Sequence, residues 1–252
     1  MQPRPPSRFP ATVCHGVARV LSKAGLCSRT QAAEWVRAGR VAVNGRRVID
    51  PEHPVRQGLD RVTVDGRALG AAARVYLALN KPRGLVTTAR DERDRDTVYA
   101  CLEGSGLPWL APVGRLDQAS EGLLLMSNDP AWAAAITEPA QGLEKTYHVQ
   151  VDAIPGDALL AKLVAGVVDA GEPLAARSAT VLRSGTRNAW LEIVLDEGRN
   201  RQIRRLLAAH GLGVLRLVRV AIGDVPLGDL AKGAWRELTV AEVSSLATPS
   251  TD

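Results

Sequence analysis

The sequence has few cysteines and no grouping of metal-ligating side chains. Its three cysteines, Cys14, Cys27 and Cys101, are far apart and form no CxxC pair, and the four histidines do not cluster with them. An odd number of scattered cysteines argues against both a disulfide framework and a zinc site. We therefore expect free thiols in a reducing cytoplasm and no bound metal.

Long apolar runs and phosphate-binding glycine loops are also missing. The longest apolar runs, such as residues 75–79 and 123–126, are far too short to span a membrane. Neither GxxxxGK followed by Ser or Thr nor GxGxxG occurs. Residues 1–16 carry four prolines without the apolar core of a signal peptide, so we expect a disordered lead-in there and a disordered tail at residues 246–252. These features predict a cytoplasmic protein without membrane contacts.

Charge is divided unevenly along the chain. Residues 1–74 carry 13 Lys or Arg against 5 Asp or Glu, a net of +8, whereas residues 75–252 carry 19 against 22, a net of −3. A basic front and a near-neutral body indicate two domains, the first of which meets a polyanion. Basic residues that merely solubilise one face would give the same count, so charge alone leaves both interpretations open.

The front part of the chain is typical of two helices followed by a small sheet. Apolar residues at helical spacing predict a helix over residues 17–24, and a capping box at residues 28–31 opens a second helix. The Asn44-Gly45 turn between short valine-containing runs predicts a hairpin, and another strand is expected at residues 62–64.

Arginines on the second helix and in the hairpin turn could share one surface that grips phosphates without reading bases. They are Arg29, Arg37, Arg40, Arg46 and Arg47. The segment KAGLCSRTQAAEWVRAGRVAVNGRRV, within residues 17–69, resembles the small RNA-binding domain named after ribosomal protein S-four. The resemblance implies binding of structured RNA by a domain spanning residues 17–70. Thr30 stands where a second arginine often follows Ser-Arg.

From residue 75 the pattern changes to many short strands and a few helices. Strands are expected at residues 75–79, 123–126, 146–151, 179–182 and 190–195, and helices at residues 131–136, 157–165 and 201–210. Strands outnumber helices without βα alternation. This favours an α+β fold whose larger domain has a mixed, largely antiparallel sheet with flanking helices, over a doubly wound sheet. The joint at residues 70–73 marks the boundary, so the larger domain spans residues 75–245.

Two segments of this domain carry single residues suited to chemistry. Asp117 follows a Gly114-Arg115 entry and precedes an apolar strand, although on spacing alone it could equally cap a turn. Tyr147 alternates with polar residues along a strand, and a core aromatic ring is the simplest interpretation of it. The chain has only five Trp, three Tyr and one Phe, so each ring that could stack on a base counts.

A third segment, residues 197–205, turns at a glycine and begins a helix. Ile203 lies on the inward stripe of this helix and Arg204 on its flank, whereas Arg201 and Arg205 lie on the far side. A flank arginine can reach a partly buried acid, and arginines on the far side can contact phosphates. Periodicity alone does not separate this arrangement from an ordinary basic, solvated helix.

The motifs LNKPRGLVTT, VGRLDQASEGLLLMSND, KTYHV and EGRNRQIRRLL, followed by LVRVAIGDVPLGDLAKGAWREL, together resemble RsuA/RluB-type ribosomal pseudouridine synthases. The resemblance spans about residues 75–240, in the family's order and spacing, behind the family's usual front domain. It implies an enzyme that isomerises uridine to pseudouridine in ribosomal RNA, as a cytoplasmic monomer without metal or organic cofactor. The EGRNRQIRR and GAWREL segments favour large-subunit (23S) over small-subunit (16S) RNA.

Carried over residue by residue, the resemblance makes Asp117 the catalytic carboxylate, Tyr147 the ring that packs against the target base, and Arg204 the arginine that pairs with the acid. The expected substrate-binding residues are Arg115, Ile203, Arg201, Arg205, Asn80 and Lys81. The acid either attacks the ribose carbon or removes a neighbouring ribose proton, and the sequence does not choose between these routes. The uridine must leave its stack to reach it.

Two segments depart from the family's pattern. Residues 91–98 read Asp-Glu-Arg-Asp-Arg-Asp-Thr-Val where relatives often have Asp-x-x-Gly-Arg-Pro-Thr-Val, and Glu138 stands where a histidine is common before Pro139. Both bear on the choice of target more than on the chemistry. The rival interpretations are a non-catalytic RNA-binding assembly factor and a glycosidase or nuclease. The presence of all three catalytic candidates disfavours the first, and the lack of clustered acids or a histidine pair disfavours a nuclease.

Overall fold

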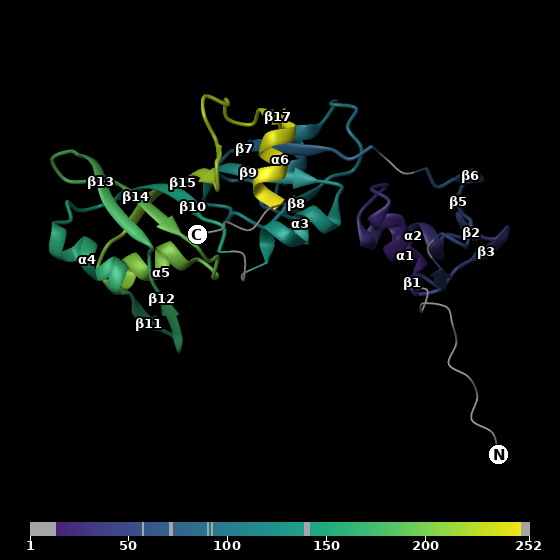
Figure 1. Cartoon of the computed structure of the whole chain (residues 1–252), viewed down its shortest axis with the longest axis horizontal. Coiled ribbons are helices and arrows are strands. Elements are labelled where there is room, and N and C mark those ends of the chain that lie inside the picture. Colours follow the sequence, from purple (N-terminus) through teal and green to yellow (C-terminus); the bar gives the residue numbers. More distant parts are fainter. Residues whose placement is uncertain are drawn as a thin grey trace, which may run out of the picture. The chain divides into compact units, whose positions relative to one another are not determined.

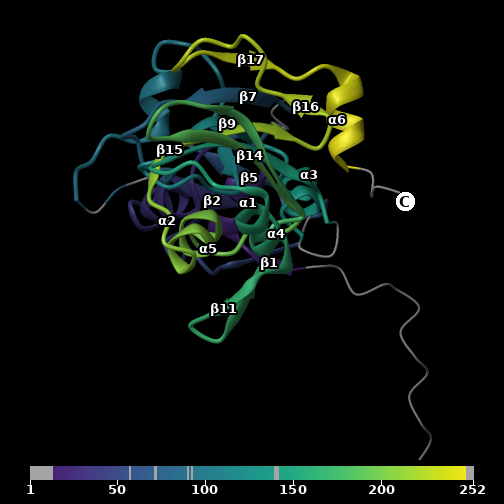
Figure 2. The ribbon, with the colours of Figure 1, turned by 90° about the vertical axis from the view of Figure 1, so that its left-hand side faces the viewer.

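The computed structural model describes residues 14–56, 58–70, 73–89, 91, 93–138 and 142–247 (Figures 1 and 2). The chain divides into two compact units. The first comprises Met1–Arg74 with Leu107–Leu110, and the second comprises Val75–Gly106 with Ala111–Asp252. A disordered lead-in is predicted for residues 1–16. Residues 1–13 lie outside the described residues, and residues 14–16 form a strand. Of the predicted tail, residues 246 and 247 belong to a helix and the rest lies outside the described residues.

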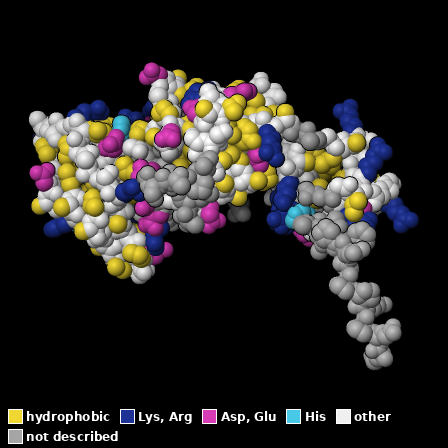
Figure 3. Space-filling model, viewed as in Figure 1, with side chains coloured by type: hydrophobic (Ala, Val, Ile, Leu, Met, Phe, Trp, Pro, Cys, Tyr) yellow, Lys and Arg dark blue, Asp and Glu magenta, His cyan; other side chains and the backbone are white. Residues whose placement is uncertain are grey.

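The first unit consists of two helices and two small sheets. The helices are α1 (Val17–Lys23) and α2 (Arg29–Arg37). Strand β1 (Cys14–Gly16) pairs with β4 (Pro54–Arg56). A four-stranded sheet has the order β3 (Arg46–Val48), β2 (Val41–Val43), β5 (Val62–Val64), β6 (Arg67–Ala68). Basic side chains stand out on the face of this unit seen in Figure 3.

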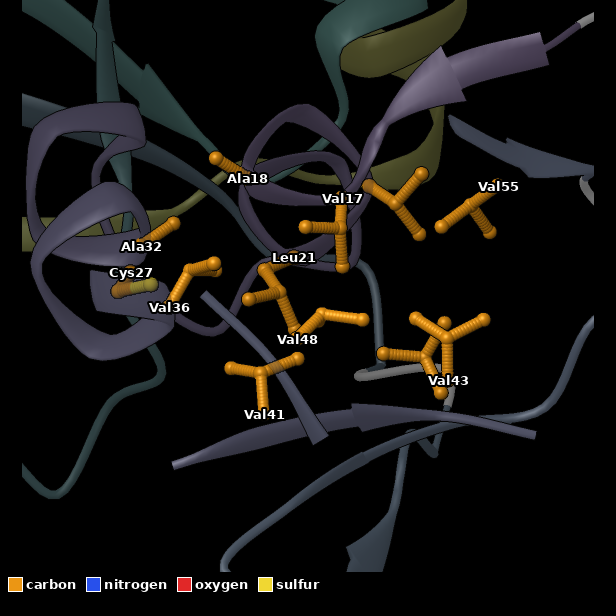
Figure 4. Packing of buried hydrophobic residues seen from close by; sticks show 12 residues of the cluster. Val17, Ala18, Leu21, Cys27, Ala32, Val36, Val41, Val43, Val48 and Val55 are labelled. Carbon is orange, nitrogen blue, oxygen red and sulfur yellow. The ribbon is translucent and has the colours of Figure 1, made fainter. Parts of the chain in front are cut away.

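Local signals in the first unit take the forms that the sequence predicts. Ser28 caps α2, because its Oγ accepts a hydrogen bond from the Gln31 N–H (3.1 Å). Asn44 and Gly45 both have positive φ, as a tight hairpin turn between β2 and β3 requires. Both helices bury apolar side chains against the four-stranded sheet, and Figure 4 shows this core. Its members include Val17, Leu21, Ala32, Val36, Val41, Val43 and Val48.

The second unit is built on one nine-stranded sheet. The main path runs β13 (Ser178–Ser184), β14 (Ala189–Leu195), β10 (Lys145–Val151), β15 (Val214–Ile222), β9 (Glu121–Ser127), β7 (Tyr76–Lys81), β17 (Trp235–Glu237). Off this path, β8 (Ala111–Val113) pairs with β9, and β16 (Val225–Pro226) pairs with β15. Every pairing in this sheet is antiparallel except that of β9 with β15. The predicted mixed, largely antiparallel α+β fold is confirmed.

Helices and one hairpin flank this sheet. The helices are α3 (Pro130–Thr137), α4 (Asp157–Ala165), α5 (Gln202–Ala209), α6 (Val240–Ala247) and the short 3-10 helix η1 (Val98–Leu102). Helices α4 and α5 lie on the same side of the sheet, and the hairpin of β11 (Val167–Asp169) and β12 (Glu172–Leu174) projects from that side (Figures 1 and 2). Within the described residues, none of the helices combines the length and the apolar character that crossing a bilayer requires.

The sheet has a short seam near its middle. Strands β9 and β15 share two residue pairs, Glu121 with Val218 and Gly122 with Arg219, whereas β10 and β15 share seven and β7 and β9 share six. Gly122 has φ +100°, and a side chain there would collide with the backbone of Arg219. The buried Glu121 carboxylate forms ion pairs with Arg216 (2.9 Å) and Lys232 (2.7 Å) beside this seam.

Candidate active site

The residues predicted for chemistry meet in one cleft of the second unit, with a volume of about 940 Å³. The loop before β9, strand β10 and the start of α5 all contribute to its walls. Most of the predicted catalytic and substrate-binding residues line it, namely Arg115, Asp117, Tyr147, Arg201, Ile203 and Arg204. Three others, Asn80, Lys81 and Arg205, are described by the structure but are not part of the lining.

The backbone around Asp117 is fixed on both sides. Thr87 Oγ1 donates to the carbonyl oxygen of Leu116 (2.8 Å) and accepts from its N–H (3.3 Å). On the other side, the Ser120 N–H donates to the carbonyl oxygen of Asp117 (3.0 Å). The Asp117 side chain remains 35% exposed. The loop therefore presents a carboxylate to the cleft without depending on that carboxylate for its own shape.

Lys81 supports this loop from behind. Its side chain is fully buried, and its Nζ donates to the carbonyl oxygens of Ser120 (2.8 Å), Pro82 (3.0 Å) and Asp117 (3.2 Å). Three carbonyls match the three N–H bonds of an ammonium group. Burial lowers the pKa of Lys81 to about 8, and the negative charge of Asp117 opposes that shift. Its three N–H groups are all bound to the loop, whereas the sequence predicts a contact of Lys81 with substrate.

Asn80, the second predicted substrate contact on β7, is also used structurally. Its side-chain amide donates to the carbonyl oxygen of Leu230 (2.6 Å), and its backbone pairs with Gly233 and Ala234. The residue is 8% exposed. Asn80 thus holds the loop before β17 rather than a group in the cleft.

The arginine that contacts Asp117 in the structure is Arg201, not Arg204. Arg201 Nη1 lies 3.7 Å from Asp117 Oδ2, with about half of the arginine side chain exposed. Arg204 instead donates from Nη2 to the carbonyl oxygen of Ala119 (3.2 Å), and its buried Nε has no partner among the described residues. Burial and the charge of Arg201 lower the pKa of Arg204, whereas the charge of Asp117 raises it. Arg204 therefore lies near the acid without an ion pair to it.

Arg205 differs from the predicted phosphate contact. Its guanidinium forms ion pairs with Asp169 on β11 and Glu172 on β12, and it also donates to the carbonyl oxygen of Asp169 (2.8 Å). Helical spacing does place it away from the cleft, as predicted. The projecting hairpin supplies two carboxylates there, however, so Arg205 ties α5 to that hairpin.

The turn into α5 is held by Gln202, a buried residue at the first position of the helix. Its side chain accepts from the Arg199 N–H (3.1 Å) and donates to Glu197 (2.7 Å) and to the carbonyl oxygen of Ala175 (3.1 Å). Arg201 adopts φ +50° in this turn, a conformation that side chains other than glycine rarely take. The turn thereby aims a cationic side chain at the cleft.

Tyr147 and Ile203 form apolar walls of the cleft. Along β10, Tyr147 alternates with half-buried polar residues, and it is 8% exposed. Ile203 is 4% exposed on the inward stripe of α5, as the periodicity predicts. A flat ring and a branched side chain at these positions suit an aromatic base.

One buried cation of the cleft was not predicted. Arg219 on β15 lines the cleft and is 5% exposed. Its Nε donates to the carbonyl oxygen of Leu123 (2.7 Å). Its place among the apolar residues Val218, Val220 and Ile222 is the signal that could have identified it.

Within the unusual segment at residues 91–98, Asp91, Arg93 and Arg95 line the cleft. Asp91 accepts from the N–H groups of Arg93 (3.1 Å) and Arg95 (3.0 Å) and forms an ion pair with the Arg95 side chain. These contacts, led by the Arg95 side chain, lower the pKa of Asp91. Asp94 has φ +52° at the position where relatives often have glycine. The family's Asp and Arg positions are therefore kept, and the departure is confined to residues between and after them.

Of the five arginines predicted to bind RNA in the first unit, three have protein partners. Arg29 pairs with Glu52 (3.2 Å), Arg40 pairs with Asp65 and lies over the Trp35 ring, and Arg47 donates to the carbonyl oxygen of Ala38 (3.2 Å). Arg37 and Arg46 are exposed, without a partner among the described residues. Arg46 and Arg47 border a shallow hollow on this unit.

No group of three His, Cys, Asp or Glu side chains is arranged to hold a metal ion in the part of the chain that the structure describes. The three cysteines carry free thiols. The polar side chains that line the cleft are arginines, one lysine, carboxylates, amides and hydroxyls.

Known proteins share both units. Residues 75–209 match the RNA pseudouridylate synthase family, and residues 17–62 match the S4 domain. The ribosomal large subunit pseudouridine synthase B of Bacillus subtilis is 35% identical over 231 residues, which cover 90% of this chain and 93% of the relative. A protein of Rickettsia bellii named as an uncharacterized RNA pseudouridine synthase is 37% identical over 223 residues, with coverages of 88% and 96%.

A solved structure gives the same result at the level of the fold. The crystal structure of a pseudouridylate synthase matches with a TM-score of 0.63 and 29% sequence identity, covering 92% of this chain and 99% of the other. Its match extends over nearly the whole of both chains. The chain with this acid-bearing cleft therefore belongs to the RNA pseudouridine synthase family and carries an S4 domain in front of its catalytic domain.

Proposed function

We propose that the protein converts uridine to pseudouridine in ribosomal RNA, with large-subunit (23S) RNA as the substrate. The observation that carries the proposal is the position of Asp117. Hydrogen bonds to its backbone carbonyl oxygen fix the loop, and its carboxylate is presented to a cleft rich in arginine. The Bacillus subtilis relative, named for the large ribosomal subunit, supports the choice of RNA.

The reaction needs one carboxylate and no water. The bond from ribose C1′ to N1 of uracil breaks, a bond from C1′ to C5 forms, and the proton lost from C5 is balanced by one gained at N1. Positive charge develops on the sugar as the first bond breaks, and a nearby anion stabilises it, as in glycoside hydrolysis. Asp117 supplies that anion, whether it attacks C1′ or removes a neighbouring ribose proton.

Tyr147 and Ile203 supply the surface on which the uracil ring rests. Their low exposure means that a base reaching them has left its stack in the RNA, at a cost of a few kcal/mol. Burial of the ring offsets part of this cost. The same apolar contact lets the detached ring turn before it is rejoined to the sugar, because it imposes no fixed hydrogen-bond direction.

Arg201 and Arg204 have different roles, one in binding the RNA backbone and the other in orienting Asp117. The ion pair of Arg201 with Asp117 is long and half-exposed, so it is weak and readily exchanged for a phosphate. Arg204 is held more deeply and has an unpartnered Nε near the acid. In the RNA complex, Arg201 binds the backbone and Arg204 orients Asp117. Arg115, exposed on the rim, adds a second phosphate contact.

The test is a map of pseudouridines in ribosomal RNA from cells that contain or lack the protein. We expect at least one site in the large-subunit RNA to be lost and to be restored by the wild-type chain but not by Asp117→Asn. Asp224→Asn, a change at an exposed acid that is not part of the cleft lining, is the matched control and should restore the site. An unchanged map, or restoration by Asp117→Asn, would refute the proposal.

A further inference from the structure

Arg219 is a buried cation with unused donors. It lies in the middle of β15 with 5% of its surface exposed, and it lines the cleft. Its Nε is bound by the carbonyl oxygen of Leu123 (2.7 Å), whereas its buried Nη2 has no hydrogen-bond partner. Among the described residues no carboxylate forms an ion pair with it. Buried guanidinium groups are normally paired, so this one calls for an explanation.

The neighbouring charges do not neutralise Arg219. The charge of Arg219 contributes, after burial, to the lowered pKa values of Lys145 and Lys81, so two further cations lie near it. None of the described acids that line the cleft forms an ion pair with Arg219. Glu197 pairs with Arg199, Asp91 with Arg95 and, at 3.7 Å, Asp117 with Arg201. Asp196 acts on Lys145. The described residues therefore leave donors of Arg219 available to a bound ligand.

The position of Arg219 relative to Tyr147 suggests what that partner is. The two residues are direct partners across β10 and β15, so their side chains share one face of the sheet. Both line the cleft. A base packed against the Tyr147 ring has an edge beside the Arg219 guanidinium.

We propose that Arg219 is a specificity-determining residue that donates its free N–H groups to the O4 carbonyl of the target uracil and thereby selects uridine over cytidine. This inference rests on the proposed function. Ring geometry selects O4 because C4 lies opposite N1, the atom joined to the sugar. Asp117, which must meet the sugar, is 35% exposed, whereas Arg219 is only 5% exposed. The edge of the base that lies farthest from the sugar therefore faces Arg219. Cytosine carries an amino donor in place of O4, so two donors would face each other.

The same contact serves both ends of the reaction. Turning uracil about the axis through N3 and C6 exchanges N1 with C5, and it also exchanges O2 with O4. A guanidinium that donates to O4 before the turn therefore meets O2 after it. Arg219 can hold the substrate ring and the turned ring with one set of donors, which cytosine does not allow.

The test measures nucleotide binding, so it does not depend on turnover or on which RNA is modified. The full-length protein is titrated with uridine and cytidine 5′-monophosphates and followed by NMR chemical shifts. The variants are Arg219→Met, Arg219→Lys and the control Arg183→Met. Arg183 is an exposed arginine of β13 whose guanidinium lies over the ring of Trp190. We expect the wild type and the control to prefer the uridine nucleotide by roughly tenfold, the typical effect of one charge-assisted hydrogen bond.

Arg219→Met should bind both nucleotides equally, and Arg219→Lys should keep part of the preference. Exchanging O4 for sulfur, a weaker acceptor, should weaken binding to the wild type but not to Arg219→Met. Thermal unfolding of Arg219→Met should occur at or above the wild-type temperature, because the change removes a buried charge that lacks a counter-ion.

Two results would overturn the inference: a wild type without nucleotide preference, or an Arg219→Met variant that retains the preference. If Arg219→Met does not fold, Arg219→Lys decides the matter, because an undiminished preference in it refutes selection by the guanidinium. If the preference depends on Arg219 but no rRNA site is lost in cells, the proposed substrate fails and the selection of uracil stands.

Discussion

Replacing Lys81 with methionine tests whether the loop that carries Asp117 depends on its buried support. Methionine has a similar length and no charge, so the change removes the three hydrogen bonds to the loop without leaving a large cavity. Asp117 O keeps the donor of Ser120, but Ser120 O and Pro82 O have no other donor among the described residues. One buried carbonyl group, that of Ser120, and one partly buried carbonyl group, that of Pro82, are then unpaired.

Two opposing terms make the effect on stability small. Two unpaired carbonyls cost about 2–6 kcal/mol in the free energy of unfolding. Against this, the variant no longer buries an ammonium group. The pKa of Lys81 is lowered from 10.5 to about 8, and this shift corresponds to about 3 kcal/mol. The net change therefore lies between a gain of about 1 and a loss of about 3 kcal/mol. Catalysis should suffer more, because a loop displaced by about 1 Å can cost about 100-fold in rate.

The assay is tritium release from RNA labelled at C5 of uridine, measured in a single turnover at saturating enzyme, with thermal unfolding in parallel. The matched control is Lys162→Met, which removes an exposed lysine of α4 outside the cleft lining. A chemical rate for Lys81→Met within threefold of the wild type would refute the view that Lys81 positions Asp117.

Three further predictions concern pH, α5 and the first unit. The chemical rate should fall above about pH 8, where neutral Lys81 has two N–H bonds for three carbonyls, and this fall should be absent in Lys81→Met. Because the folded state binds fewer protons than the unfolded state between about pH 8 and 10.5, the contribution of Lys81 to stability should rise over that range, which urea unfolding can measure. Arg204→Met should lower the single-turnover rate, whereas Arg205→Met should keep it and speed hydrogen exchange in the β11–β12 hairpin; the reverse pattern would show that the two roles are exchanged. Deleting residues 1–70 should weaken RNA binding and flatten its salt dependence while circular dichroism shows a folded remainder, and an unchanged salt slope would count against RNA contact by the first unit.

Elements with strong local signals could be predicted from the sequence. The capping box at Ser28, the Asn44-Gly45 turn and the alternation around Tyr147 each encode their structure within a few neighbouring residues. Strand β15 was missed, although it lies at the centre of the larger sheet. Its arginines interrupt the apolar pattern, and one of them, Arg219, is buried where sequence patterns predict exposure.

The candidate site shows the same division between local and long-range information. Motif order brings Asp117, Tyr147 and Arg204 to one cleft, as predicted. Side-chain partners depended on segments far away in sequence. Arg205 meets the β11–β12 hairpin more than thirty residues earlier, and Lys81 meets a loop about forty residues later. Helical and strand periodicity do not predict contacts between residues so far apart in sequence. The sequence therefore assigns both residues to substrate binding.

The short seam between β9 and β15 divides the chemistry of the enzyme between two mechanical parts. The loop that carries Asp117 leaves β8 and enters β9 on one side, whereas Tyr147 and Arg204 belong to β10 and α5 on the other. Two residue pairs and the Glu121 ion pairs connect the sides, together with the hydrogen bonds of Arg219 to Leu123 and of Arg204 to Ala119. A small change in the angle between the two parts alters the distance from acid to ring without bending a strand. If RNA spans the cleft as proposed, it acts on that angle directly, and the binding energy of nucleotides far from the target base can set the reacting distance.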